Sequence, residues 1–238
     1  ALFSPTMIDF SKIKAISLDL DDTLWPVWPT IARAEETLAL WLAEKAPGTV
    51  PLCAIAGYQR QIREAMPSLR PDLGNDLSAL RREAIRVLLE RAGEDPGLAE
   101  PAFEVFFEAR QKVIFYEDAL SALDFLKSRY PMVALSNGNA DIQKVGLKGY
   151  FVAAFNPINL GVGKPDPKMF HAGAQALGVL PEAILHIGDD PHLDVVAAQR
   201  AGLQAVWLNR EEKLWTHEDH PAPFTVSSLR VLCDSWPH

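Results

Sequence analysis

A short acidic segment near the start of the chain carries residues that could do chemistry. Asp19, Asp21 and Asp22 fall within four residues, and the hydroxyl group of Thr23 follows them. In a strand, residues two apart project to the same face, so we expect Asp19 and Asp21 to lie side by side. Two carboxylates that close repel each other, and one pKa rises unless a cation intervenes. The spacing therefore predicts a metal site with reactive carboxylates at the end of a strand.

The same residues also fit a plainer interpretation. Asp and Thr are common in solvated turns and at the first positions of helices, so the cluster alone does not distinguish a turn from a site. Residues 15–18, just before it, form an apolar run typical of a buried strand. The metal-site interpretation is preferred to the solvated turn only if other polar segments of the chain lie at the same end of this strand.

Further polar segments occur later in the chain. Ser136–Asn139 and Gly188–Asp194 each follow an apolar run, and Lys164 lies in a loop rich in Gly and Pro between them. In open α/β sheets, ligands bind outside the carboxyl ends of the strands. We therefore expect these residues to converge with Asp19 on one site.

The elements that must place these residues alternate between strands and helices. Strands are expected at 15–18, 131–135, 152–155, 183–187 and 205–208, and helices at 118–129, just before Gly149, at 167–177 and at 193–201. This alternation predicts an α/β fold, a Rossmann-like doubly wound parallel sheet.

Residues 30–113 show a helical pattern instead, with apolar residues three and four apart. The expected helices run from Thr30 to Pro47, over 52–66, from a cap at Asn75 or Asp76 to Gly93, and onward from Pro101. Residues 26–29, with two prolines, fit a linker or flap. We predict a core domain of residues 1–25 and 114–238, interrupted after its first strand by a helical domain of residues 26–113.

Composition and net charge limit the classes of function that the chain can have. The chain has 238 residues, 48% of them hydrophobic, and a net charge of −8, which argues against nucleic-acid or anionic-membrane binding. Cys53 and Cys233 lack metal-type spacing and indicate reduced thiols. Residues 1–7 make a poor signal peptide, and no apolar run approaches the roughly 20 residues of a membrane span. We expect a cytoplasmic protein that binds no membrane; the oligomeric state stays open.

Four motifs carry a family resemblance. They are Asp-Leu-Asp-Asp-Thr at 19–23, Ser-Asn-Gly at 136–138, Gly-Lys-Pro-Asp-Pro at 163–167, and Gly-Asp followed by a later Asp at 188–194. In this order they resemble the motifs of haloacid dehalogenase-like hydrolases, over nearly the whole core. The helical insertion resembles the C1-type cap of that family.

The resemblance implies a role for each residue. Asp19 would be the nucleophile that attacks phosphorus and forms an aspartyl-phosphate. Asp21 would protonate the leaving group and then activate water, while Lys164 would neutralise Asp19 and the phosphoryl group. The implied cofactor is Mg²⁺, held by the carboxylates of Asp19 and Asp189 and the main-chain carbonyl of Asp21.

Substrate contacts and supporting residues are also implied. The expected substrate-binding residues are Leu20, Ser136, Asn137 and Gly138, the last two through backbone N–H groups. Thr23 and Asp194 would support the site, Asp194 by orienting Lys164 or a metal-bound water.

Several nearby residues are open to two interpretations. Asp190 fits either a supporting or a solvated position. His186 lies in an apolar run and is interpreted as packed core, and His192 as capping a turn. Arg81 and Arg82, in the helical domain, could bind substrate, although exposed arginines are the commoner case.

The leading hypothesis is a magnesium-dependent phosphatase for small phosphate esters. A 2-haloacid dehalogenase of the same family would lack the acid/base Asp and the metal, so Asp21 and Asp189 argue against it. A phosphomutase would share every core residue. A receiver-type phosphoacceptor module would be half this length, and a non-catalytic binding protein would not need the full set of carboxylates.

The substrate is less defined. Leu-Asp-Asp-Thr-Leu-Trp, Ser-Asn-Gly-Asn and Ile-Gly-Asp-Asp are similar to the bacterial branch that dephosphorylates flavin mononucleotide and a riboflavin-pathway ribityl phosphate. Tryptophans of the linker and helical domain would suit stacking on a flavin ring. Sugar phosphates and phosphoglycolate remain open.

Overall fold

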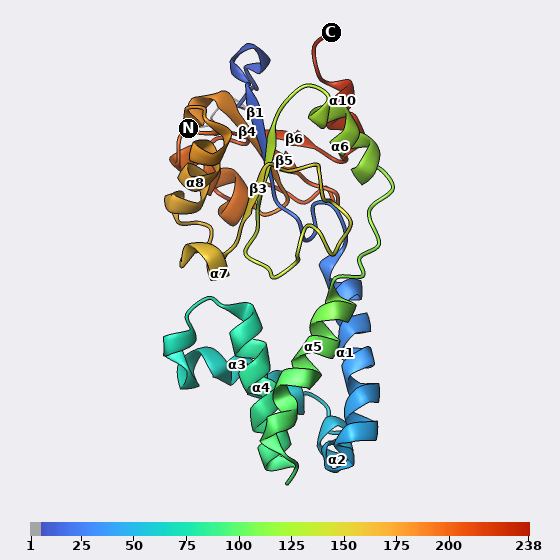
Figure 1. The fold of residues 1–238 in the computed structure, drawn as a ribbon. Coiled ribbons are helices and arrows are strands. Elements are labelled where there is room, and N and C mark those ends of the chain that lie inside the picture. The colour runs from blue at the N-terminus through green and yellow to red at the C-terminus, as the bar shows by residue number, and fades with distance from the viewer. Residues whose placement is uncertain (1–5) are drawn as a thin grey trace. The chain divides into compact units, whose positions relative to one another are not determined.

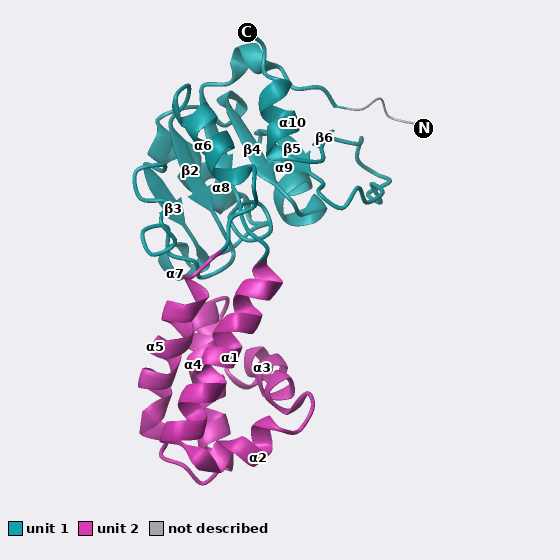
Figure 2. Cartoon of the chain, turned by 90° about the vertical axis from the view of Figure 1, so that its right-hand side faces the viewer, with its two compact units in different colours: residues 1–26, 114–238 teal, residues 27–113 magenta. Residues whose placement is uncertain are grey.

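The computed structural model describes residues 6–238, which divide into two compact units (Figure 2). The α/β unit combines the segment up to Pro26 with Ile114–His238, and the helical unit is Val27–Val113. The first five residues of the predicted core domain, and most of the segment 1–7 discussed above, lie outside the described residues.

A six-stranded parallel sheet forms the centre of the α/β unit, in the order β3-β2-β1-β4-β5-β6. Its strands are β1 Ala15–Leu18, β2 Met132–Leu135, β3 Ala153–Phe155, β4 Ile184–Gly188, β5 Gln204–Leu208 and β6 Phe224–Val226. The strand order reverses beside β1, so the carboxyl ends of β1, β2 and β4 meet where doubly wound sheets bind ligands. The predicted Rossmann-like fold is confirmed.

Helices cover both faces of this sheet (Figure 1). They are α6 Ala119–Lys127 and α10 Leu229–Asp234 on one face, and α8 Pro167–Leu177 and α9 Ala197–Arg200 on the other, with the short α7 Pro157–Leu160 after β3. Every residue of β1, β2 and β4 is buried, because helices exclude water from both faces. This burial explains why these strands are mostly apolar in the sequence, with Ser17 in β1 and His186 in β4 as polar exceptions.

The helical unit packs around its own apolar core. Its helices are α1 Val27–Lys45, α2 Val50–Cys53, α3 Tyr58–Leu69, α4 Leu77–Arg91 and α5 Ala99–Arg110. Leu42, Met66, Leu89 and Phe106 are each at most 1% exposed in this core. The predicted start of α4 is confirmed, since the Asp76 side chain accepts from the Ala79 N–H at 2.9 Å.

Three predictions near prolines and glycines were wrong. Helix α1 begins at Val27, because Pro29 lies in its first turn, where no N–H donor is needed. The helix expected over 52–66 is divided between α2 and α3 at Gly57, whose φ is 76°, and Pro67 lies inside α3.

Two more boundaries of the α/β unit differ. The helix expected before Gly149 is a series of turns, and the helix expected over 193–201 begins as the π-helical turn Pro191–Val196 before continuing as α9. The sequence patterns also did not predict α7, β6 or α10.

Within residues 6–238, none of the helices has the length and apolarity needed to cross a bilayer. Cys53 and Cys233 are both free thiols, as predicted.

Candidate active site

Asp19 directly follows β1 at the centre of the sheet. Its N–H donates to the carbonyl of Ile187 at 3.0 Å and continues the β1–β4 ladder one residue past the strand. The residue is 7% exposed. The sheet therefore fixes a buried carboxylate at the point where the strand order reverses.

A tight turn follows Asp19. Thr23 and Leu24 both donate their N–H groups to the Leu20 carbonyl, and Asp22 adopts a φ of 64°. The expectation that Asp19 and Asp21 share a strand face was wrong, because β1 ends at Leu18. Asp21 is instead held by its own partner.

That partner is Trp25, whose Nε1 donates to Asp21 Oδ1 at 2.8 Å. Trp25 is fully buried against Phe115, with ring centroids 5.7 Å apart, so it anchors the acidic turn and does not line an opening. Leu20 is 2% exposed, so its side chain is not available to a substrate.

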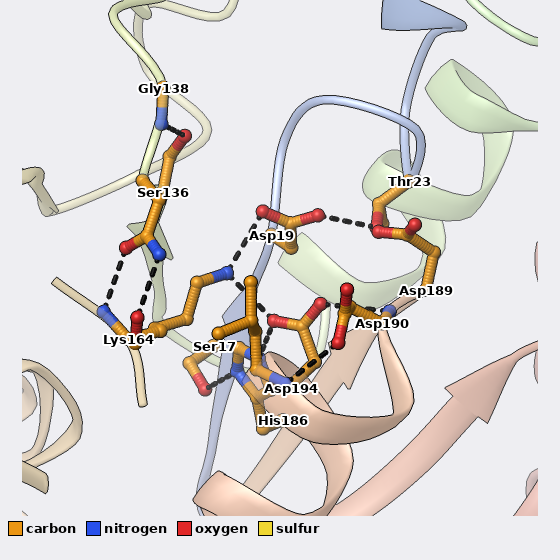
Figure 3. A network of polar contacts seen from close by, with 12 residues as sticks. Ser17, Asp19, Thr23, Ser136, Gly138, Lys164, His186, Asp189, Asp190 and Asp194 are labelled. Atoms are coloured by element: carbon orange, nitrogen blue, oxygen red, sulfur yellow. Dashed lines mark hydrogen bonds and ion pairs between the residues drawn. The ribbon is translucent and has the colours of Figure 1, made fainter. Parts of the chain in front are cut away.

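Lys164 reaches Asp19 from the loop before α8. Its Nζ lies 3.0 Å from Asp19 Oδ1 and 2.7 Å from Asp194 Oδ1, and all three side chains are buried (Figure 3). Burial disfavours the ammonium ion, but the two carboxylates outweigh that effect and raise the pKa of Lys164. The lysine is therefore a fixed positive charge beside Asp19.

The Lys164 backbone is clamped by a side chain whose role the sequence did not reveal. Asn137 Nδ2 donates to the Lys164 carbonyl at 2.8 Å, and Asn137 Oδ1 accepts from the Lys164 N–H at 2.7 Å. A Cβ at Gly163 would lie 2.7 Å from Asn137 Oδ1, so only glycine leaves room for this contact. The sequence signal that could have revealed this contact is the presence of Asn137 in one motif and Gly163-Lys164 in the next.

Ser136 begins the loop after β2. It is buried, and its Oγ accepts from the Gly138 N–H at 2.9 Å (Figure 3). This hydrogen bond stays within the loop, and the contact that joins the loop to the site is that of Asn137 with Lys164.

Asp189 faces Asp19 from the end of β4. The Thr23 hydroxyl lies between them, 3.0 Å from Asp19 Oδ2 and 3.3 Å from Asp189 Oδ1. Burial raises the pKa of Asp19 against the opposing effect of Lys164, and burial together with Asp19 raises the pKa of Asp189. Two carboxylates in this state, one buried and one partly buried, favour a proton or a metal cation between them.

Oxygen atoms of Asp19, Asp189 and Asp194 lie within 4.8 Å of one another, which marks a candidate cation site. Asp194 fits a different role, because its oxygens are already occupied. Oδ1 accepts from Lys164 and His186, and Oδ2 accepts from the Asp190 N–H at 3.1 Å. Asp19 and Asp189 are hard oxygen donors of the kind that Mg²⁺ prefers.

Close packing brings Asp194 to this position. A Cβ at Gly188 would lie 2.2 Å from Asp194 Cγ, so the approach requires glycine. Asp190 caps the π-helical turn by accepting from the N–H groups of His192 and Leu193, at 2.9 and 2.8 Å. The capping role predicted for His192 therefore belongs to Asp190, and the His192 ring stacks on His217 instead, 6.3 Å away.

His186 was interpreted as packed core, and this was incomplete. The ring is fully buried, but Nδ1 lies 2.7 Å from Ser17 Oγ and Nε2 lies 2.8 Å from Asp194 Oδ1. Ser17 and His186 are register partners on β1 and β4. Two polar residues interrupting neighbouring apolar strands were the signal that could have revealed the pair.

The arginines considered for substrate binding lie on α4. Arg81 stacks on Phe106 at 4.1 Å and pairs with Glu35 at 3.1 Å. Arg82 stacks on Phe103 at 4.4 Å and pairs with Glu100. Both side chains have partners within the helical unit.

Comparison with known sequences agrees with this geometry. The family model of haloacid dehalogenase-like hydrolases matches residues 13–202. The 5-amino-6-(5-phospho-D-ribitylamino)uracil phosphatase YigB of Escherichia coli K12 is 30% identical over 208 residues, covering 84% of this chain and 85% of the relative. Phosphoserine phosphatase of Thermus thermophilus is 30% identical over 205 residues, covering 84% and 74%.

Solved structures give a second comparison. A crystal structure described as 2-haloacid dehalogenase from Pseudomonas syringae pv. Tomato DC3000 superimposes with a TM-score of 0.85 and 36% identity. The match covers 93% of this chain and 97% of that one. Similarity therefore extends to proteins named for two different reactions.

Proposed function

The chain belongs to the haloacid dehalogenase-like hydrolases, and from that premise we propose that it is a magnesium-dependent phosphatase acting on small phosphomonoesters. The observation that carries the proposal is the pair of carboxylates on either side of the Thr23 hydroxyl, Asp19 buried and Asp189 partly buried. A hydrolase that releases halide needs no cation beside its nucleophile. A phosphatase with a carboxylate nucleophile does, because the phosphate group under attack is itself negatively charged and repels the carboxylate.

Asp19 is the proposed nucleophile. Its carboxylate oxygen attacks phosphorus, the bond from phosphorus to the ester oxygen breaks, and an aspartyl-phosphate forms. Lys164 Nζ, 3.0 Å from Asp19 Oδ1, offsets negative charge on the carboxylate and on the phosphoryl group. Ser136 accepts from Gly138 and keeps its own hydroxyl hydrogen for a substrate oxygen.

Asp21 is the proposed acid and base. It gives its proton to the leaving alkoxide, then takes a proton from the water that hydrolyses the aspartyl-phosphate, which restores both carboxyl groups. The Trp25 hydrogen bond orients Asp21 for both steps. Asp19, Asp189 and the Asp21 carbonyl would hold Mg²⁺, which when bound would neutralise the carboxylates and attract the phosphate.

A 2-haloacid dehalogenase is the second candidate, because the Pseudomonas syringae structure with that description is 36% identical. One experiment separates the two. The protein is assayed on p-nitrophenyl phosphate and on 2-chloropropionate, each with Mg²⁺ and with EDTA. We expect phosphate release that EDTA abolishes and no chloride release; chloride release in EDTA without phosphate release would overturn the proposal.

The nucleophile is tested in the same assay. Asp19→Asn keeps the size of the side chain and should lower phosphate release by about 10⁴-fold or more, as loss of a nucleophile does in other covalent hydrolases. An unchanged thermal melting curve would show that the fold is intact. Turnover near the wild-type rate would remove Asp19 from this role.

For the substrate, we propose a ribityl phosphate or flavin mononucleotide. The similarity to the Escherichia coli phosphatase supports the ribityl phosphate, and the motif resemblance described above supports flavin mononucleotide. Trp28, the tryptophan of the linker considered for stacking, is 78% exposed. A metabolite panel should include both compounds with phosphoserine, phosphoglycolate and sugar phosphates. Free phosphate as product supports hydrolysis, whereas an isomeric phosphate ester would indicate a phosphomutase.

A further inference from the structure

His186 lies one hydrogen bond behind the Lys164–Asp194 ion pair. Asp194 Oδ1 accepts from two groups, Lys164 Nζ at 2.7 Å and His186 Nε2 at 2.8 Å (Figure 3). Ser17 holds the opposite ring nitrogen at 2.7 Å. A continuous chain of hydrogen bonds thus runs from Ser17 to Asp19, and all five side chains in it are buried.

The chain has a defined direction. Asp194 is ionised, because Lys164 and His186 lower its pKa against the opposing effect of burial. An ionised carboxylate only accepts, so His186 Nε2 must carry the hydrogen. Burial lowers the pKa of His186 and favours the neutral ring, so Nδ1 accepts from the Ser17 hydroxyl.

We propose that His186 is a positioning residue, whose neutral imidazole fixes Asp194 and thereby holds the Lys164 ammonium group against Asp19. The inference rests on the proposed function, in which Lys164 neutralises charge at the nucleophile. Asp194 Oδ2 is held by the Asp190 N–H, so His186 and Asp190 together determine where the carboxylate lies. Without His186, Asp194 would keep only its contacts with Lys164 and the Asp190 N–H. Its carboxylate would then be less firmly oriented, and the Lys164 ammonium group would move with it.

Simple packing is the competing explanation. The His186 ring contacts Phe170 edge-on, with centroids 5.1 Å apart. Packing would be retained by any side chain of similar size, wherever its polar atoms lie. Positioning requires a hydrogen-bond donor at the place of Nε2.

Two amide variants separate these explanations. His186→Gln places an amide nitrogen near Nε2 and can still donate to Asp194, whereas His186→Asn reaches only the Nδ1 position. We expect His186→Asn to lower kcat by about 10- to 100-fold, the cost of a misplacement of up to 1 Å, with KM changed less than about twofold. His186→Gln should recover most of kcat. Equal kcat in the two variants, whether low or near wild type, would overturn the proposal.

A control histidine shows the effect of losing an imidazole elsewhere. His171 lies on α8 and is exposed, and its Nε2 lies 3.0 Å from the Ala201 carbonyl oxygen. His171→Asn should leave kcat and KM unchanged. Melting curves of all three variants check that each is folded.

A second readout does not depend on activity. In protein labelled with ¹⁵N-lysine, the buried Lys164 ammonium group should exchange its hydrogens slowly with water, and Lys164→Met assigns its signal. We expect faster exchange in His186→Asn and near wild-type exchange in His186→Gln; identical exchange in both would overturn the positioning role. If wild type hydrolyses no phosphate ester, the proposed function fails and this measurement alone decides the inference.

Discussion

Charged side chains are used differently in the two units of this chain. In the α/β unit, Lys164, Asp19 and Asp194 are buried at the end of the sheet and share hydrogen bonds. In the helical unit, Arg86 pairs with Glu83 and Glu90 along one face of α4, and the Arg86 and Glu90 side chains are 39% and 48% exposed.

The difference follows from solvation. A buried ion pair needs its partners, because removal of one leaves a charge that neither water nor protein compensates. A pair at the surface is screened, and its loss costs little. We therefore expect substitutions in the buried network to affect both stability and activity, and substitutions in the surface network to affect neither strongly.

The largest expected effect comes from Lys164→Met, which keeps the volume of the side chain and removes its charge. Asp19 and Asp194 would remain buried without a cation, and we expect a loss of about 3–5 kcal/mol in the free energy of unfolding, measured in urea without metal ions. Phosphate release should also fall sharply. A loss below about 1 kcal/mol would break the contrast between the two units.

The stability difference between Lys164→Met and wild type should depend on pH in a defined direction. In wild type, Lys164 holds the pKa of Asp194 low, which stabilises the fold above the ordinary carboxyl pKa of about 3.9. In Lys164→Met, burial dominates and raises that pKa, so the folded state binds more protons and gains stability as pH falls. The difference between variant and wild type should therefore be largest near neutral pH and shrink toward acid pH.

Sequence patterns predicted the sheet better than the contacts between its loops. Buried strands such as β1 and β2 are mostly apolar, and their carboxyl ends had to meet because parallel strands are joined by helices. Motif positions therefore placed Asp19, Lys164 and Asp189 near one another, although the sequence could not show which atoms touch.

Specific hydrogen bonds explain the errors. Asp21 was expected against Asp19, but a turn with a positive φ at Asp22 directs it to Trp25, and Asp189 lies beside Asp19. The hydrogen bonds of this turn are local, yet residue spacing does not reveal them. The interpretation of His186 as packed core was incomplete for another reason, since its partners Ser17 and Asp194 come from other segments.

Gly188→Ala should have an intermediate effect, because it strains the buried network without removing a charge. The new Cβ would lie 2.2 Å from Asp194 Cγ, so Asp194 must move away from Lys164. We expect a loss of about 1–3 kcal/mol in stability, as for other overpacked cores, and at least a tenfold fall in kcat. Gly173→Ala is the matched control. In that variant the new Cβ would lie 3.2 Å from the Val133 side chain, away from the buried network, so we expect kcat to equal that of wild type.

The smallest expected effect is in the helical unit. Glu90→Gln removes the charge that pairs with Arg86 one helical turn earlier, and the Glu90 side chain is 48% exposed. Pairs of this spacing on a helix contribute about 0.3–0.5 kcal/mol, and Arg86 keeps Glu83 as a second partner. Urea unfolding should therefore show a loss below about 0.5 kcal/mol that vanishes in 1 M salt, where charges are screened within about 3 Å. A loss of several kcal/mol that persists in high salt would mean that α4 depends on its ion pairs as strongly as the active site does, and solvation would no longer explain how the two units differ.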